Sequence, residues 1–173
     1  SLQKRVYRII DTWQYLEERF PEWRLTIVGD GDERENLEKQ VDILGLSRVH
    51  FVGFMSPNEY YKRASILILT SEYEGFPLVL AECMSFGVVP AVYGSYSAVY
   101  DIIDDGIDGI ILPFHSKKEF DAEIMSEKIA GLINNDTLRN KMALKALEKS
   151  KHYDIETIYN KWNQLFNKLI CNQ

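Results

Sequence analysis

The chain has 173 residues, of which 46% are hydrophobic and 12% are aromatic. This length fits one ordinary domain with a substantial core, and the aromatic content excludes a disordered segment. The net charge of −6 argues against a general nucleic-acid or anionic-membrane surface, so we expect no nucleic-acid partner.

The positions of the cysteine, histidine and apolar residues indicate which cellular compartment and which kinds of site to expect. No run of 18 apolar residues is present, and the first residues lack the pattern of a signal peptide. Cys83 and Cys171 lie far apart, and the three histidines are scattered along the chain. We therefore expect a cytoplasmic protein with reduced thiols and no metal site, because metal ligands normally cluster in sequence.

Helical and strand patterns alternate along the chain. Apolar residues at helical spacing, with start and stop signals, predict helices over 4–19, 32–44, 122–134, 136–150 and 154–170, and further helices begin near Pro57 and Pro77. Short apolar runs predict five strands, over 25–28, 49–52, 66–70, 88–93 and 109–112. Because most of these runs are continuously apolar, they suit strands buried on both faces of a parallel sheet.

This alternation predicts a Rossmann-like α/β fold, a doubly wound parallel sheet with flanking and C-terminal helices, as a single domain over residues 1–173. In such sheets ligands bind at the carboxyl ends of the strands. The loops expected to form the site are therefore residues 29–32, 53–56, 71–77, 94–98 and 113–116.

The segment SEYEGFPLVLAE, residues 71–82, leaves the third predicted strand and enters a helix near Pro77. Proline lacks the N–H that the first helical position does not need. The backbone donors of Phe76, Leu78 and Val79, together with the helix dipole, would then form an anion site. Since Gly75 also allows close approach to the backbone, we expect a phosphate at this helix start.

Two carboxylates flank this turn, and the residues alone leave both open to two interpretations. Glu74 fits an acid that stabilises the helix dipole as well as it fits a functional group. Glu82 shares a helical stripe with Ala81 and Ser85, beside apolar faces. It would either reach solvent or accept hydrogen bonds from the two hydroxyls of a ribose.

The stretch SEYEGFPLVLAECMSFGVVPAVYGSYSAVYDIIDDGIDGIIL resembles the C-terminal domain of the family 4 retaining glycosyltransferases, which have the GT-B fold. The family signature, E-x7-E inside S-x-x-E-G-F-x-L-V-L-x-E-A-M, is matched from Ser71 to Met84, with Cys83 in place of the alanine. The later D-I-I-x-D-G-x-x-G pattern is matched by residues 101–109, and the resemblance covers roughly residues 2–150.

The resemblance implies roles for particular residues. Glu74, the catalytic residue, would contact hydroxyls of the transferred sugar and position it, and Glu82 would hold the ribose of the nucleotide. The loop after Val52 would lie beside the base of the nucleotide. The donor-binding residues implied in all are Lys4, Gly29, Gly75, Phe76, Pro77, Leu78, Val79 and Glu82.

Two of these residues lie outside the signature. Lys4 looks like the family's diphosphate-binding lysine, usually within Q-K-G, although here Arg5 replaces that glycine and an exposed terminal residue is the alternative. Gly29 opens GDGDER, which has Arg34 where a dinucleotide fingerprint has its third glycine. We interpret GDGDER as a strand-to-helix turn near the site. Ser95 and Ser97 could donate to the sugar or the phosphates.

The family domain begins with a strand and a G-R pair that would precede this chain. We therefore expect a fragment that lacks the acceptor-binding N-terminal domain and is inactive alone. The lost strand is central in the usual order. The strands at 25–28 and 66–70 are then expected either to pair in a closed-up five-stranded sheet or to leave a gap that self-association fills.

The resemblance predicts a retaining hexosyl or related transferase that uses a UDP-, GDP- or ADP-sugar donor and needs no cofactor or metal. The acceptor would be a glycan or lipid-linked saccharide in polysaccharide or lipopolysaccharide biosynthesis, with the full enzyme cytoplasmic or membrane-associated. Two alternatives remain: another GT-B enzyme, such as a sugar-nucleotide epimerase or phosphorylase, and a non-catalytic α/β interaction module.

Overall fold

The computed structural model describes residues 2–115 and 119–171, and it has the predicted α/β architecture. Every strand pair is parallel. The strands are β1 (Leu25–Ile27), β2 (Val49–Phe51), β3 (Ile66–Leu69), β4 (Val89–Gly94) and β5 (Ile110–Pro113). All five lie within one or two residues of the predicted runs, because each run is short, apolar and bounded by turn residues.

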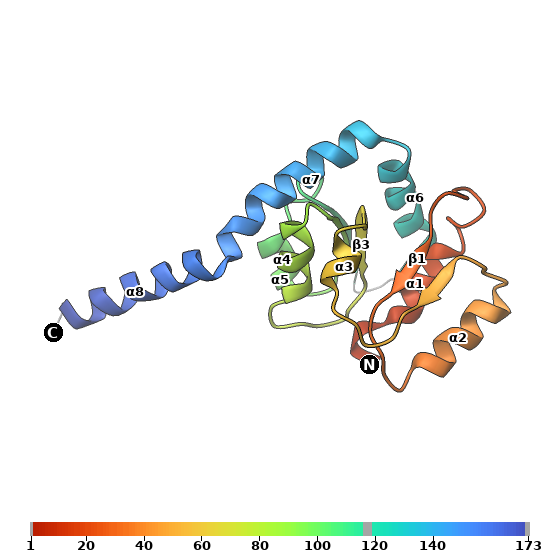
Figure 1. Cartoon of the computed structure of the whole chain (residues 1–173), viewed down its shortest axis with the longest axis horizontal. Coiled ribbons are helices and arrows are strands. Elements are labelled where there is room, and N and C mark those ends of the chain that lie inside the picture. The colour runs from red at the N-terminus through yellow and green to blue at the C-terminus, as the bar shows by residue number, and fades with distance from the viewer. Residues whose placement is uncertain (1, 116–118, 172–173) are drawn as a thin grey trace.

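Helices connect the strands and complete the chain (Figure 1). They are the 3-10 helix η1 (Leu2–Lys4), α1 (Val6–Trp13), α2 (Arg34–Ile43), α3 (Asn58–Tyr61), α4 (Leu78–Ser85), α5 (Ser97–Ile102), α6 (Ala122–Ile133), α7 (Asp136–Ser150), the 3-10 helix η2 (Lys151–Tyr153) and α8 (Ile155–Cys171). The first helix is shorter than predicted. It starts after Arg5, whose backbone is left-handed, and beyond Trp13 the chain continues in turns.

The strands form two sheets instead of one. One sheet has the order β1-β2 and the other β3-β4-β5, and no pairing between β1 and β3 is found in the described parts of the chain. The expectation of a closed-up five-stranded sheet is therefore wrong. Both sheets nevertheless pack on the same core, since Leu25 of β1 and Ile66 of β3 contact one hydrophobic cluster. Side-chain packing, without a β1–β3 hydrogen-bond ladder, fixes their arrangement.

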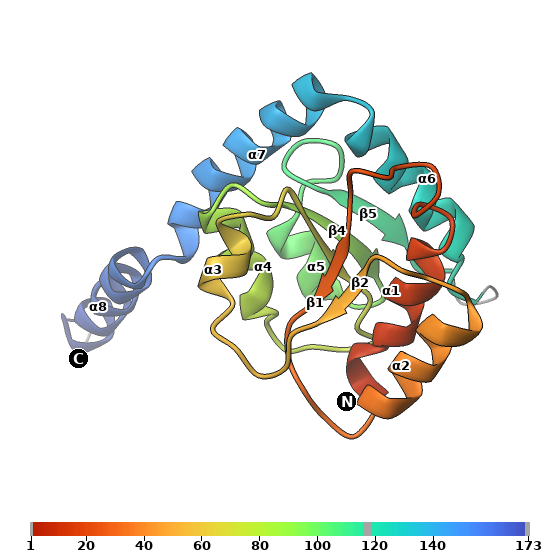
Figure 2. The ribbon, with the colours of Figure 1, turned by 45° about the vertical axis from the view of Figure 1, so that its right-hand side comes forward.

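The fully buried β4 divides the core into two layers. Val89, Ala91 and Tyr93 point toward a cluster that includes residues of α6, while Val92 points toward a second cluster built on α4 and α5. This alternation follows from the two-residue period of a strand. Helix α7 packs along α4 and also contacts α6 (Figure 2). The layers therefore hold α4, which carries the signature, against the central strand.

Helix α8 extends away from the rest of the molecule (Figure 1). Its large apolar side chains are exposed along its length: Ile155, Ile158, Tyr159, Trp162, Leu165, Phe166, Leu169 and Ile170. Among the helices of the described residues, none is long and apolar enough to cross a membrane.

Candidate functional site

The N-terminal helix η1 lies against the segment that follows β3, at the carboxyl end of that strand (Figure 2). The backbone N–H of Glu72 donates to the carbonyl of Gln3 at 3.1 Å. Lys4 Nζ lies 2.7 Å from Glu74 Oε1, so two predicted site residues form an ion pair although 70 positions separate them. Lys4 is thus paired with Glu74 although it is exposed, and its role toward a diphosphate stays a prediction.

Arg5 makes the turn that directs Lys4 toward Glu74. Its φ and ψ angles are 49° and 44°, and no other non-glycine residue in the described chain has a positive φ. Glycine takes this conformation without a steric penalty, which explains the Q-K-G pattern of the family. Here the Arg5 side chain contacts Glu72 at 2.8 Å, which anchors the strained turn.

Arg8 is a residue that the sequence analysis missed. Its Nη2 atom lies 3.0 Å from Glu72 Oε1, and its guanidinium lies over the ring of Tyr93 at 5.3 Å. Arg5 and Arg8 together lower the pKa of Glu72, chiefly through the hydrogen bond from Arg5. The signal was present in the sequence, since Lys4, Arg5 and Arg8 form a basic cluster at helical spacing.

Glu74 lies between β3 and α4, and its side chain is 13% exposed. Its Oε1 atom accepts hydrogen bonds from Lys4 Nζ and from Ser71 Oγ, both at 2.7 Å. The predicted donor Ser95 follows β4, and its hydroxyl donates to the Ser71 carbonyl at 2.6 Å. The carboxylate is therefore held from two directions at the edge of the sheet.

The start of α4 differs in one respect from the prediction. Pro77 has φ −76° and ψ 84°, and the N–H of Leu78 donates to the Phe76 carbonyl at 2.9 Å. The Leu78 donor is therefore engaged, and helix α4 starts one residue after Pro77. In the described chain, the N–H groups of Phe76 and Val79 have no backbone acceptor and remain available to an anion.

The surroundings of this turn leave its backbone accessible. Gly75 is exposed, and a Cβ atom built there would meet no atom within 4 Å. The Phe76 ring packs against Tyr153 of η2 with a centroid distance of 5.6 Å, and the Tyr153 hydroxyl donates to the Asp101 carbonyl. The C-terminal part of the chain thus supports the turn from one side.

Glu82 lies on α4, four residues after Leu78, and is exposed. Its Oε2 atom accepts a 3.3 Å hydrogen bond from the hydroxyl of Tyr61, which is buried at the end of α3. Burial, and secondly the Glu82 charge, raise the pKa of Tyr61, so Tyr61 stays a neutral donor. Because α3 follows the loop after β2, Tyr61 connects the predicted base loop with Glu82.

A hollow of about 460 Å³ borders Glu82 on its other side. Residues of α4 and of the α7–α8 connection line it, among them Leu78, Glu82, Lys151 and Tyr153. Both polar and apolar side chains line this hollow, so Glu82 borders open space as well as Tyr61.

Gly29 lies apart from the other predicted residues. Its φ is 130°, which favours glycine, and its N–H donates to the Gly53 carbonyl at 2.8 Å. This bond joins the loops that follow β1 and β2. Among the described residues, no hydrogen bond or ion pair joins Gly29 to Glu74 or Glu82. The role of Gly29 toward a donor stays a prediction.

The sequence profile of the family described as glycosyl transferases group 1 matches residues 1–149. The chain belongs to this family. It is 30% identical over 171 residues to the amylovoran biosynthesis glycosyltransferase AmsD of Erwinia amylovora. The matched region covers 96% of this chain and 46% of AmsD. An alpha-1,4-N-acetyl-D-galactosaminyltransferase of Campylobacter jejuni, named for a saccharide on PP-undecaprenol, is 30% identical over 145 residues, or 83% of this chain and 38% of that protein. The chain therefore spans less than half the length of these curated relatives.

Solved structures of glycosyltransferases share the fold of this group 1 domain. A variant of TarM from S. aureus, crystallised with fondaparinux, alpha-GlcNAc-glycerol and UDP, superposes with a TM-score of 0.84 at 26% identity. The match covers 95% of this chain and 33% of that one. The chain is thus a GT-B C-terminal domain in size and fold.

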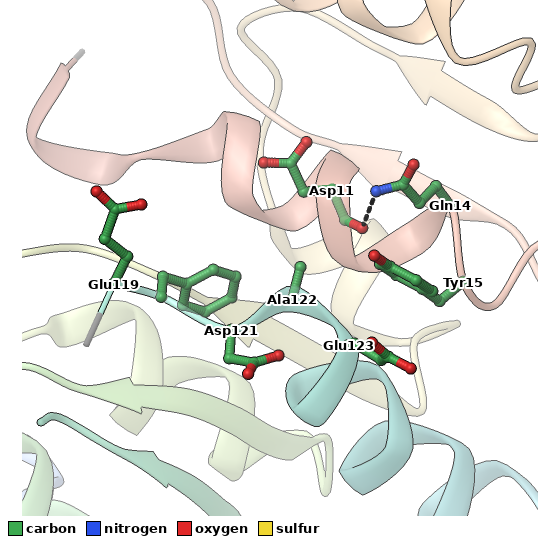
Figure 3. Close-up of a pocket in the computed structure, with 8 residues that line it drawn as sticks. Asp11, Gln14, Tyr15, Glu119, Asp121, Ala122 and Glu123 are labelled. Atoms are coloured by element: carbon green, nitrogen blue, oxygen red, sulfur yellow. Dashed lines mark hydrogen bonds between the residues drawn. The ribbon is translucent and has the colours of Figure 1, made fainter.

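Another hollow of this glycosyl transferase domain lies between α1 and the start of α6 (Figure 3). It measures about 560 Å³, and its acids, Asp11, Glu119, Asp121 and Glu123, would repel a diphosphate. It contains none of the predicted residues. On chemical grounds, Lys4, Glu74 and the start of α4 therefore remain the candidate site.

Proposed function

We propose that this domain binds the donor of a glycosyl transfer, a sugar on a nucleoside diphosphate. The whole enzyme would transfer that sugar with retention to a glycan or lipid-linked acceptor. The observation that carries the proposal is the convergence of Lys4, Glu74 and the α4 start at one sheet edge, with Glu82 further along the same helix. Its family favours transfer over the epimerase and phosphorylase alternatives.

Each group has a distinct task in this proposal. Lys4 and the free N–H groups at the α4 start would neutralise the diphosphate, which becomes the leaving group. Glu74 would accept hydrogen bonds from sugar hydroxyls and orient the anomeric carbon. Glu82 would accept the ribose hydroxyls, with Tyr61 holding its carboxylate. A metal-free reaction stays an expectation.

Donor binding would rearrange the ion pair. Lys4 Nζ is engaged by Glu74 at 2.7 Å, and its side chain is 45% exposed, so the lysine can turn without crossing packed groups. Because water reaches the lysine end of the pair, we expect it to contribute only about 1 kcal/mol, which the charge-assisted hydrogen bonds of a diphosphate would outweigh. Glu74 would then exchange its lysine partner for sugar hydroxyls.

The acceptor is proposed from the relatives alone. The C. jejuni relative is named for a PP-undecaprenol saccharide, and the TarM variant was crystallised with alpha-GlcNAc-glycerol. By analogy, a lipid-linked or polymeric acceptor in cell-envelope or exopolysaccharide synthesis fits this chain, handled by the part of the enzyme that the relatives have in addition. A cytoplasmic or membrane-associated location would suit that chemistry.

Nucleotide binding tests the proposal directly. Thermal unfolding of the chain with UDP, GDP and ADP should show a rise in Tm with one of them, and Glu82→Gln should abolish the rise because an amide removes the charge and one acceptor. Glu127→Gln is the matched control, since Glu127 lies on α6 and pairs with Arg19, which is not one of the candidate site residues. A Tm that no nucleotide changes would leave a non-catalytic module as the better interpretation.

A further inference from the structure

The Glu74 carboxylate is held through one of its two oxygens. Glu74 lies in an irregular segment, so no helix or strand geometry fixes its side chain. Both of its hydrogen bonds, from Lys4 Nζ and Ser71 Oγ, reach Oε1. Within residues 2–115 and 119–171, no hydrogen bond to Oε2 is found. One oxygen is therefore anchored, while the other is open to a ligand.

The two donors to Oε1 differ in their surroundings. The Lys4 side chain is 45% exposed, so water screens its interaction with Glu74. Ser71 is 1% exposed and directly follows the strand-end residue Thr70, which is itself buried. Because water does not reach the buried hydroxyl of Ser71, no water molecule competes with Glu74 for its hydrogen bond. Ser71 is thus the donor that fixes the carboxylate.

Ser71 is itself held by the sheet. Its carbonyl accepts a 2.6 Å hydrogen bond from Ser95 Oγ, and Ser95 directly follows β4. Strand β4 pairs with β3 over four residues and is buried throughout. The hydrogen bonds from Ser95 to Ser71 and from Ser71 to Glu74 therefore tie the carboxylate to the fully buried central strand of the sheet.

We propose that Ser71 is a positioning residue of the donor site. Its hydroxyl holds Oε1 of Glu74 so that Oε2 faces a hydroxyl of the donor sugar, and this hold persists after Lys4 turns to the diphosphate. Ser71 acts through Glu74 and does not itself contact the sugar. The inference rests on the proposed function, because it concerns the same donor.

Paired titrations test this role. Wild type and Ser71→Ala are titrated calorimetrically with UDP and UDP-glucose, GDP and GDP-mannose, and ADP and ADP-glucose. For the pair that wild type binds, Ser71→Ala should keep its affinity for the bare nucleotide within about two-fold but lose about ten-fold for the sugar nucleotide, the effect of one hydrogen bond to a charged group. Ser71→Thr, which keeps the hydroxyl, should restore the preference.

Ser126→Ala is the matched control. Ser126 is also fully buried and donates one 2.7 Å hydrogen bond, to the Glu123 carbonyl in α6. It should lower Tm about as much as Ser71→Ala and leave the preference for the sugar nucleotide unchanged. A crystal structure of Ser71→Ala should show Glu74 displaced.

The outcomes separate this inference from the proposed function. An unchanged preference in Ser71→Ala, with Glu74 in place, overturns the inference alone. Wild type that binds a nucleotide but gains nothing from any attached sugar overturns the role of Glu74 and this inference with it, while donor-nucleotide binding stands. Wild type that binds none of the six probes overturns both.

Discussion

At the residue scale, the candidate site depends on a turn that is unfavourable for the residue that makes it. Arg5 has a left-handed backbone, which costs an L-residue with a Cβ roughly 1–2 kcal/mol. The turn directs Lys4 to Glu74, and the Arg5–Glu72 contact helps to hold it. Strain here therefore serves the geometry of the donor site.

Two substitutions of Arg5 separate backbone strain from charge. Arg5→Gly and Arg5→Val both remove the pair with Glu72, but only valine adds a β-branched side chain at positive φ. We expect Arg5→Val to be less stable than Arg5→Gly by about 1–2 kcal/mol in urea unfolding. Equal stability of the two variants would show that the turn is not left-handed in solution.

Tyr61→Phe removes only the hydroxyl that donates to Glu82. Nucleotide affinity should fall about five-fold, because Glu82 loses the partner that orients it, while Tm changes little since the ring remains packed on Phe86. Tyr159→Phe is the control, because Tyr159 is exposed on α8, which extends away from the rest of the molecule. Calorimetric titration with the nucleotide that wild type binds measures the difference.

The signature residues could be chosen from the sequence because their types and spacing are specific. Their pairings with other residues could not be predicted. Tyr61 lies 21 positions before Glu82, and Lys4 lies 70 before Glu74, so only the fold brings them together. The hydrogen bond from the N–H of Leu78 to the Phe76 carbonyl could not be predicted from the sequence either, since it depends on the ψ angle of Pro77.

At the scale of elements, the junction between η1, α1 and the segment after β3 is electrostatic. Glu72 forms ion pairs with Arg5 and Arg8, and its hydrogen bonds with these arginines lower its pKa. A carboxylate whose folded pKa lies below its unfolded pKa stabilises the fold above the unfolded pKa, and this stability is lost as pH falls through the folded pKa.

Glu72→Gln should therefore have an effect that depends on pH. At pH 7 the variant should unfold at a lower Tm than wild type. Below the ordinary glutamate pKa of about 4.3, the difference should shrink as wild-type Glu72 becomes protonated. Thermal scans from pH 7 to pH 3 measure it, and a Tm difference that stays constant with pH would contradict a charged role for Glu72.

The pairing of β4 with β5 needs a glycine. A Cβ atom on Gly109 would come within 2.8 Å of both the ring and the carbonyl of Pro90, the second residue of β4. Gly131 lies in α6, where an added Cβ meets nothing within 4 Å. The same substitution should therefore have opposite effects at the two sites.

We expect Gly109→Ala to destabilise the protein by about 1–3 kcal/mol through overpacking. Gly131→Ala should stabilise it by about 0.5–1 kcal/mol, because alanine favours a helix interior. Urea unfolding of both variants measures the change. Two variants that shift in the same direction would disagree with the packing at Pro90.

Most elements could be predicted from the sequence, since apolar periodicity, proline and glycine mark their bounds. The first helix could not be bounded, because its apolar pattern continues to Leu16, which is buried within turns and not within the helix. The apolar pattern of a sequence indicates which side chains are buried. A helix and a series of turns can bury the same side chains, so the pattern does not show where the helix ends.

At the scale of the whole molecule, two sheets share one core. The prediction of parallel α/β layers is confirmed. Of the two arrangements expected for β1 and β3, direct pairing was wrong and unpaired edges are found, because apolar patterns say nothing about which strand edges meet. The edges of β1 and β3 that would face each other are unpaired in the described chain. Self-association through this gap stays a prediction.

The extended position of helix α8 should increase the radius of gyration that X-ray scattering measures. A compact chain of 173 residues has a radius of gyration of about 16 Å, while 17 helical residues add an arm about 26 Å long. Small-angle scattering of the monomer should therefore give a radius clearly above the compact value and a pair-distance distribution with a long tail. A symmetric distribution would mean that α8 folds back and covers its apolar face.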